Sequence, residues 1–234
     1  EGNRIVSAEV IRELQTPQTI TEIDDFHPDA HFLADGLGWF LHDYHGRKVV
    51  EHGGAIDGMR AFVALVPEEN LGIVVLANYG LHGLRQSVVS HVIDAYLGAE
   101  PHDWQQIYFE RIERILEARA AAKTQREEAR IKNTETSLAP ADYVGRYTNA
   151  VYGDAEVTLE DGVLTLDPKA HPAVSGQLEH WQFDTFLCTW TDPVWDESLV
   201  YFDLDDSREV SQFRFTVRPD MIDPLEYVFA KQEE

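Results

Sequence analysis

Short helical and strand-like patterns of hydrophobic residues alternate along the first hundred positions of the chain. Ser7 can cap a helix whose apolar positions fall on one face and which ends before Pro17. Residues 38–43 and 48–51 have the composition of two strands, with a glycine-containing turn at residues 45–47. The pattern therefore predicts mixed helices and strands from the beginning of the chain.

Two strongly apolar runs, residues 59–66 and 71–77, enclose a short polar loop that begins with a proline. This arrangement predicts a hairpin, and the continuous apolarity of its strands favours a sheet buried on both faces. Residues 84–97 then have helical spacing of their apolar positions, and Gly98 can end that helix as a C-cap.

Residues 103 to about 132 form a charged segment with helical periodicity. Its apolar stripe is narrow and fades after Ala122, so the end of the segment is predicted to be a solvated linker. A coiled-coil partner helix is the alternative, but the stripe is short for it. The stripe consists of Trp104, Tyr108, Ile112, Ile115 and Leu116.

The last hundred residues are rich in short strand-like runs. Turn signals such as Asp161-Gly162 separate them, which predicts an antiparallel barrel or sandwich. The runs are residues 155–159, 163–166, 181–190, 199–204, 212–217 and 227–230. We therefore predict three parts: residues 1–100, a helical linker at 101–137, and a β-rich domain at 138–234.

Charge and cysteine content exclude several kinds of partner and site. The 234 residues have a formal net charge of −23, which disfavours binding to nucleic acid or anionic lipid. Most of that charge lies in residues 138–234, where 6 basic and 20 acidic residues give −14. The single cysteine, Cys188, excludes an internal disulfide and a thiolate zinc site, and no apolar run reaches the length of a membrane span.

One short stretch could carry chemistry, and it begins with a basic residue followed by two glycines. His52 precedes Gly53 and Gly54 at the end of a predicted strand, and Ala55 follows them. Glycines at a strand edge let a substrate approach the backbone, and a basic side chain beside them can hold a carboxylate or assist proton transfer. The alternative is a bulge next to a surface histidine.

The order of motifs around this stretch resembles the last catalytic motif and surrounding sheet of class C β-lactamases, penicillin-binding proteins, D-aminopeptidases and esterases. The likeness covers about residues 1–100 and includes Gly36-Leu-Gly-Trp39, His52-Gly-Gly-Ala55 and Pro67-Glu-x-Asn70. It implies an α+β fold: a partial antiparallel sheet with helices of the β-lactamase/transpeptidase type, followed by the linker and the antiparallel β-barrel.

The same resemblance implies roles for four residues. His52 would bind or polarise the substrate, Gly53 and Gly54 would line it, and the Ala55 N–H would form half of an oxyanion hole. The family acts through an acyl-enzyme on amide or ester bonds, in peptides, D-amino-acid derivatives, β-lactams or small esters. It needs no metal or organic cofactor, and a periplasmic or secreted location would fit.

The sequence departs from the family in its nucleophile. No serine has a lysine three residues later, and residues 1–51 contain no Tyr-x-Asn. Tyr147-Thr-Asn149 fits the second motif only in its letters, because it opens the β-rich region. The chain begins with Glu1, so we expect the nucleophile segment to be missing and the chain to be inactive alone. The apolar hairpin at 59–77 would then be uncovered, and we expect a homo-oligomer or association with the missing N-terminal part.

Residues 138–147 resemble the start of a lipocalin-like barrel that is often appended to these hydrolases. The resemblance implies that a tyrosine and a glycine of this segment pack against the closing strand. A rival hypothesis is a non-catalytic module for ligand binding or assembly, centred on the barrel. Trp181, Phe183, Trp190 and Trp195 are the aromatic residues that could line a cavity there.

Histidines between residues 27 and 45 raise the question of zinc. His27 and His31 have helical i,i+4 spacing with Asp29 between them, and His42 and His45 follow. Pro28 makes the segment a loop, so the pair lacks a helix to fix its geometry. We therefore expect no metal site.

Overall fold

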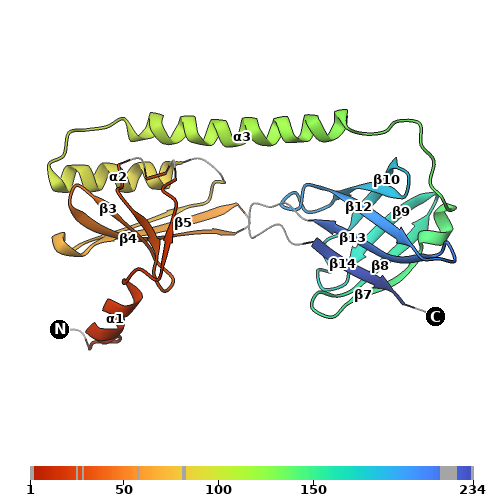
Figure 1. Cartoon of the computed structure of the whole chain (residues 1–234), viewed down its shortest axis with the longest axis horizontal. Helices are drawn as coiled ribbons and strands as arrows, with labels where there is room; N and C mark the ends of the chain where they lie inside the picture. The colour runs from red at the N-terminus through yellow and green to blue at the C-terminus, as the bar shows by residue number, and fades with distance from the viewer. Residues whose placement is uncertain are drawn as a thin grey trace. The chain divides into compact units, whose positions relative to one another are not determined.

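The computed structural model describes residues 3–24, 26–27, 29–56, 58–80, 83–216 and 226–232. The chain forms two compact units, Glu1–Ala122 and Lys123–Glu234. Each unit has its own strands (Figure 1), and each has its own hydrophobic core. The predicted α+β class is confirmed, whereas the three-part division of the chain stays a prediction.

The N-terminal unit contains a six-stranded antiparallel sheet in which the strands lie in chain order. Antiparallel neighbours joined by short turns need no crossover, so the order follows from the hairpins in the sequence. The strands are β1 (Thr19–Thr21), β2 (Leu33–Asp35), β3 (Phe40–Tyr44), β4 (Arg47–Ile56), β5 (Met59–Val66) and β6 (Leu71–Ala77). A 3₁₀ turn, Pro67–Glu69, joins the last two strands.

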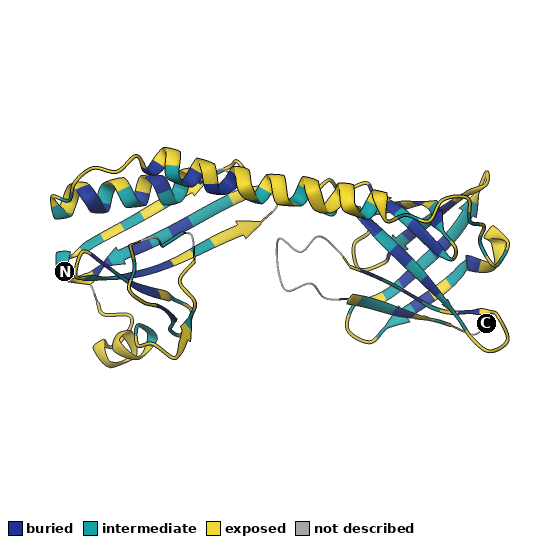
Figure 2. Cartoon of the chain, turned by 45° about the horizontal axis from the view of Figure 1, so that its top comes forward, coloured by how far each residue is buried: buried dark blue, intermediate teal, exposed yellow. Residues whose placement is uncertain are grey.

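Three helices accompany these strands. Helix α1 (Ala8–Leu14) is capped by Ser7, whose Oγ accepts from the Val10 N–H at 3.2 Å. Helix α2 (Leu84–Leu97) ends at Gly98 in the left-handed region, as the sequence predicts. Helix α3 (Trp104–Glu128) starts with buried side chains and is largely exposed in its second half (Figure 2). No helix in the described ranges has both the length and the apolarity to cross a membrane.

One face of the sheet packs against α2 and the first turns of α3. The cluster on this face joins residues from β3, β4 and β5 to residues from the two helices. Its buried members are Tyr44, Val49, Phe62, Ala64, Val66, Val89, Ile93, Trp104 and Tyr108.

The opposite face is only partly covered. Leu41 and Val50 belong to a small buried cluster there, but Val74 and Leu76 of β6 are 68% and 76% exposed. The prediction of burial on both faces is therefore wrong for β6, whereas the prediction that the apolar hairpin at 59–77 is uncovered in this chain is confirmed there. The apolar residues of β6 alternate between a helix-covered face and an open one, and continuous apolarity in the sequence does not distinguish these two surroundings.

The C-terminal unit contains a closed barrel of eight antiparallel strands, in the order β10-β11-β12-β13-β14-β7-β8-β9. Aromatic side chains fill its interior, among them Phe202, Phe213, Phe215 and Phe229. A 3₁₀ turn, Pro140–Tyr143, precedes the first strand. The strands are β7 (Gly145–Asn149), β8 (Gly153–Glu160), β9 (Val163–Pro168), β10 (Gly176–Gln182), β11 (Thr185–Trp190), β12 (Glu197–Leu204), β13 (Val210–Thr216) and β14 (Glu226–Lys231).

Closure between β7 and β14 uses the residues that the sequence indicated. Tyr147 is fully buried and pairs with Lys231, and a Cβ on Gly145 would lie 3.0 Å from the Lys231 Cε atom. The prediction that a glycine and a tyrosine pack the closing strand is thus confirmed. The likeness to lipocalins stays a prediction.

The predicted run at residues 181–190 is wrong as a single strand. The structure divides it into β10 and β11, which pair up to Gln182 and Thr185. Phe183 makes the turn with a φ of 47°, a conformation that phenylalanine rarely adopts. The only turn residue there is Asp184, without the following glycine that marks the usual two-residue hairpin turn, so the sequence signal was weak.

Candidate functional site

Strand β4 has a free backbone edge at the His-Gly-Gly-Ala motif. Ile56 and Met59 form the last pair of the β4–β5 hairpin, which makes them a hydrogen-bonded pair. Hydrogen-bonded and non-bonded pairs alternate along the ladder, so the N–H groups of Gly53 and Ala55 point away from β5. On that side β3 pairs with β4 only as far as Glu51. Among the described strands none covers this edge beyond it, and both N–H groups face outward.

His52 lies beside this edge and is exposed. Its ring stacks against Phe40, with the centroids 5.6 Å apart and the planes inclined by 17°. Behind the strand, the Arg85 guanidinium donates to the carbonyl oxygens of Gly54 at 3.2 Å and Ala61 at 2.7 Å. Burial and the nearby Arg60 lower the pKa of Arg85.

A groove of about 540 Å³ adjoins the motif on the β5–β6 side. Gly54 and Ala55 line it together with apolar side chains, including Met59 and Leu76. The structure thus brings the four predicted site residues together on one strand, next to an apolar groove. Their assignment as catalytic and substrate-binding residues stays a proposal.

The Tyr-x-Asn letters in the barrel have structural partners. The Tyr147 hydroxyl donates to the Tyr143 carbonyl oxygen at 2.7 Å, and the Asn149 amide donates to that of Val228 at 2.7 Å. Both contacts hold β7 in place within the barrel.

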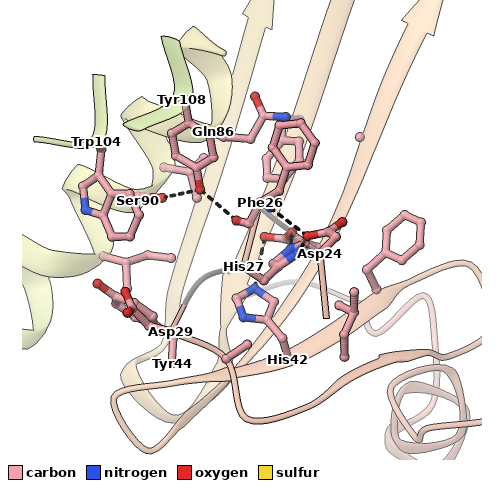
Figure 3. A pocket seen from close by; sticks show the side chains of 18 residues that line it. Asp24, Phe26, His27, Asp29, His42, Tyr44, Gln86, Ser90, Trp104 and Tyr108 are labelled. Carbon is pink, nitrogen blue, oxygen red and sulfur yellow. Dashed lines mark hydrogen bonds and ion pairs between the residues drawn. The ribbon is translucent and has the colours of Figure 1, made fainter. Parts of the chain in front are cut away.

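A second concave site lies on the other face of β4. It is a cavity of about 240 Å³ between the sheet and helices α2 and α3 (Figure 3). The Tyr108 hydroxyl lies 3.2 Å from the Ser90 Oγ and donates to the Phe26 carbonyl oxygen at 3.2 Å. His42 and Glu51 line the floor of the cavity.

Charged groups converge at that floor. His27 Nδ1 lies 2.6 Å from Asp24 Oδ1, and His27 Nε2 lies 2.8 Å from Glu51 Oε1. Burial lowers the pKa of His27, but the two carboxylates outweigh it and raise the pKa to about 9. Burial likewise raises the pKa of Glu51, but His27 and His42 outweigh it and lower the pKa to about 2.

The histidines identified from the sequence separate in the structure. His31 pairs with Asp43, its Nδ1 lying 2.6 Å from the carboxylate, and His45 occupies the β3–β4 turn in the left-handed region. His27 and His42 meet Glu51 instead. Sequence reasoning missed Glu51, although strand alternation predicts that it faces the opposite side from His52.

Comparisons with known proteins agree with the motif. Residues 1–87 match the family described as Beta-lactamase, and residues 129–228 match the one described as Domain of unknown function (DUF3471). The chain is 29% identical over 171 residues to Unguisins hydrolase ungD of Aspergillus violaceofuscus. It is 30% identical over 138 residues to Unguisins hydrolase ungD' of Aspergillus campestris.

These matches cover 68% and 56% of this chain but 30% and 24% of the two relatives, so the chain spans less than a third of their length. A solved structure, the octameric penicillin-binding protein homologue from Pyrococcus abyssi, is 18% identical with a TM-score of 0.37. That alignment covers 96% of this chain and 42% of the other. The resemblance seen in the sequence is confirmed for the first part of the chain: residues 1–87 match the Beta-lactamase family, and the two similar relatives are named hydrolases.

Proposed function

We propose that this chain supplies one wall of the active site of a β-lactamase-like serine hydrolase. In this proposal the His52–Ala55 edge of β4 binds the substrate, and a Ser-x-x-Lys nucleophile comes from a segment outside the printed sequence. The reaction is acyl transfer from an amide or ester bond through a serine acyl-enzyme. The substrate class is a peptide, a D-amino-acid derivative, a β-lactam or a small ester.

The observation that carries the proposal is the open edge of β4. The outward N–H of Ala55 can donate to the carbonyl oxygen of an extended substrate, and that of Gly53, two residues earlier on the same side, can donate to a second backbone acceptor of the same substrate. An N–H in an oxyanion hole contributes about 3 kcal/mol of transition-state stabilisation. His52 beside them offers a ring nitrogen to the substrate. Both curated relatives are named as hydrolases, which agrees with this chemistry.

The open face of β5 and β6 supports the proposal that a further segment packs against this sheet. Val74 and Leu76 are exposed there, and apolar surface of this kind marks a place where another element packs. In this proposal the nucleophile-bearing segment covers that face, and the chain alone does not turn over substrate.

The test measures hydrolysis of a p-nitrophenyl ester and of nitrocefin. The pure chain is expected to show no turnover, and mixing it with a recombinant Ser-x-x-Lys segment of a β-lactamase-like relative is expected to restore it. His52→Ala should then lower kcat/KM by about 10²-fold, the range of one acid–base or polarising group. His91→Ala is the matched control, because His91 lies exposed on α2, where its Nδ1 contacts the Ser87 carbonyl oxygen of the same helix.

Two results would contradict the proposal. One is turnover by the chain alone that His52→Ala abolishes, since the nucleophile would then lie in the printed sequence. The other is restored turnover that His52→Ala and His91→Ala affect equally, since β4 would then form no part of the site.

A cavity in the barrel unit supports a second candidate function, the binding of a small apolar ligand. It has a volume of about 200 Å³ and is lined by Trp195, Tyr152 and Tyr227, whereas Trp181 and Trp190 are buried and Phe183 is exposed. An apolar dye that quenches tryptophan fluorescence should bind this site, and Trp195→Phe should remove the quenching. Quenching that persists in the variant would exclude the cavity.

A further inference from the structure

The cavity on the helix-covered face of β4 contains a cluster that the proposed hydrolase chemistry does not use. We propose that His27, His42 and Glu51 bind a divalent transition-metal ion, of which Zn²⁺ fits best. The proposal does not rest on the proposed hydrolase function: Glu51 faces α2 and α3 while His52, the next residue, faces the other side, although Gly53 of the motif also lines the cavity.

The ligand atoms are already close together. One nitrogen from each histidine and one carboxylate oxygen of Glu51 lie within 4.8 Å of one another. Atoms bound to a common zinc ion at about 2.1 Å lie about 3.4 Å apart in a tetrahedron. Small rotations of the two rings, of about an ångström at the nitrogens, would therefore form the site.

An unpaired nitrogen points to a ligand. His42 Nε2 is buried and has no hydrogen-bond partner among the residues that the structure describes, and the His42 side chain is only 10% exposed. The nearest carboxylate oxygen, Oε2 of Glu51, is 3.5 Å away, which is an ion-pair distance but not a hydrogen bond. A buried polar atom without a partner is unfavourable, and a metal ion would satisfy it.

The outer contacts of the histidines are those of metal ligands. His27 directs Nε2 toward Glu51 while its Nδ1 contacts the Asp24 carboxylate at 2.6 Å. His42 Nδ1 lies 3.4 Å from the Asp43 carbonyl oxygen, which leaves Nε2 for the site. Carboxylate or carbonyl contacts on the far ring nitrogen fix the tautomer and orientation that a metal requires.

The donor set selects the class of ion. Two imidazoles and one carboxylate favour zinc or another late divalent metal over Ca²⁺ or Mg²⁺, which prefer oxygen ligands. Three protein ligands leave a fourth zinc position free. That position would adjoin the 240 Å³ cavity, where water or a small anion can complete the coordination.

The test is calorimetric titration of ZnCl₂ into the complete, EDTA-treated chain. The expected result is one ion per chain, saturating at micromolar concentration, and a Co²⁺ complex with the intense visible bands of tetrahedral coordination. His42→Gln should weaken binding at least about 100-fold, and Asp24→Asn about 10-fold, because outer-shell partners typically contribute 10- to 100-fold.

His31→Gln is the matched control, because that ring is 88% exposed and pairs with Asp43 away from the cluster. It should bind Zn²⁺ as the unmodified chain does. Circular dichroism of each variant verifies that it folds, and Glu51→Gln, which keeps the side-chain size, gives a second loss of affinity. Absence of saturable heat would overturn the proposal, as would an isotherm that His42→Gln and Glu51→Gln leave unchanged.

Discussion

Asp94 on α2 receives two hydrogen bonds that join the sheet to both helices. The Tyr44 hydroxyl of β3 donates to one carboxylate oxygen at 2.5 Å, and the Trp104 indole N–H of α3 donates to the other at 2.5 Å. Asp94 is only 5% exposed, so water does not compete for these bonds. Hydrogen bonds to a charged group contribute about 1.5–3 kcal/mol each.

Asp94→Asn should destabilise the N-terminal unit by about 2–4 kcal/mol. The amide keeps the shape of the side chain, but it has one acceptor oxygen for two donors, and its NH₂ faces the second donor. Tyr44→Phe removes a single donor and should lower the free energy of unfolding by about 1.5–2 kcal/mol. The double variant should lose less stability than the two single variants together, because both substitutions remove the same Tyr44–Asp94 hydrogen bond.

Amide hydrogen exchange followed by mass spectrometry can measure this in the complete chain. In Asp94→Asn, peptides from α2 should exchange at least roughly 30-fold faster, since 1.4 kcal/mol corresponds to a factor of ten. Peptides from β12 in the barrel serve as the internal reference. Glu100→Gln, an exposed acid that loses the same charge, should leave α2 unchanged. Less than a threefold change in α2, or an equal change in β12, would refute the reasoning.

Three further predictions concern the barrel and the open sheet face. Gly176→Ala should lower the stability of the barrel unit by at least about 2 kcal/mol, because its Cβ would lie 2.2 Å from Cys188 Sγ; an unchanged Tm would contradict this. Burial raises the pKa of Asp184, but hydrogen bonds from Tyr143 and Ser137 outweigh it and lower the pKa. Because the folded pKa is the lower one, this stabilisation is complete above about pH 4 and is lost as the pH falls through the folded value. Urea titrations at several pH values should show that Asp184→Asn removes this part of the pH dependence of stability. The same dependence of unfolding free energy on pH in the variant and the unmodified chain would count against it. Leu76→Lys on the open face should change the stability of the chain by less than about 0.5 kcal/mol but reduce its self-association, measured by light scattering. A monomeric mass of the unmodified chain at high micromolar concentration would exclude that association.

The fold was predictable where the signals were local. The strands at 59–66 and 71–77 and the helix at 84–97 appear with the predicted bounds, because a proline, a glycine cap and clear periodicity mark their ends. Strands β1 and β2 were missed, since each has only three residues and alternation needs more to be visible. The β10–β11 turn was missed because a phenylalanine occupies it.

The two sites differ in how far the sequence could reveal them. The His52–Ala55 motif is contiguous and could be found in the sequence, where the family resemblance favoured a substrate-binding strand edge over a bulge, and pairing in the structure explains why the edge is open. The cluster of His27, His42 and Glu51 comes from a loop and two strands, and its members meet only through the register that opposes β3 to β4. A prediction limited to helical spacing paired His27 with His31, because it lacked that register.

Glu51 and His52 are neighbours in sequence, but strand alternation puts their side chains on opposite faces of β4. Glu51 therefore belongs to the proposed metal site and His52 to the proposed hydrolase site. A substitution at Glu51 should alter metal affinity without altering turnover in the reconstituted hydrolase, and one at His52 should do the reverse. Equal loss of both properties from either change would mean that β4 had shifted as a whole. Such a shift would also weaken the Tyr44–Asp94 hydrogen bond. Tyr44 belongs to β3, and it is paired with Arg47 of β4. The exchange rate of α2 therefore distinguishes the loss of a ligand from displacement of the strand.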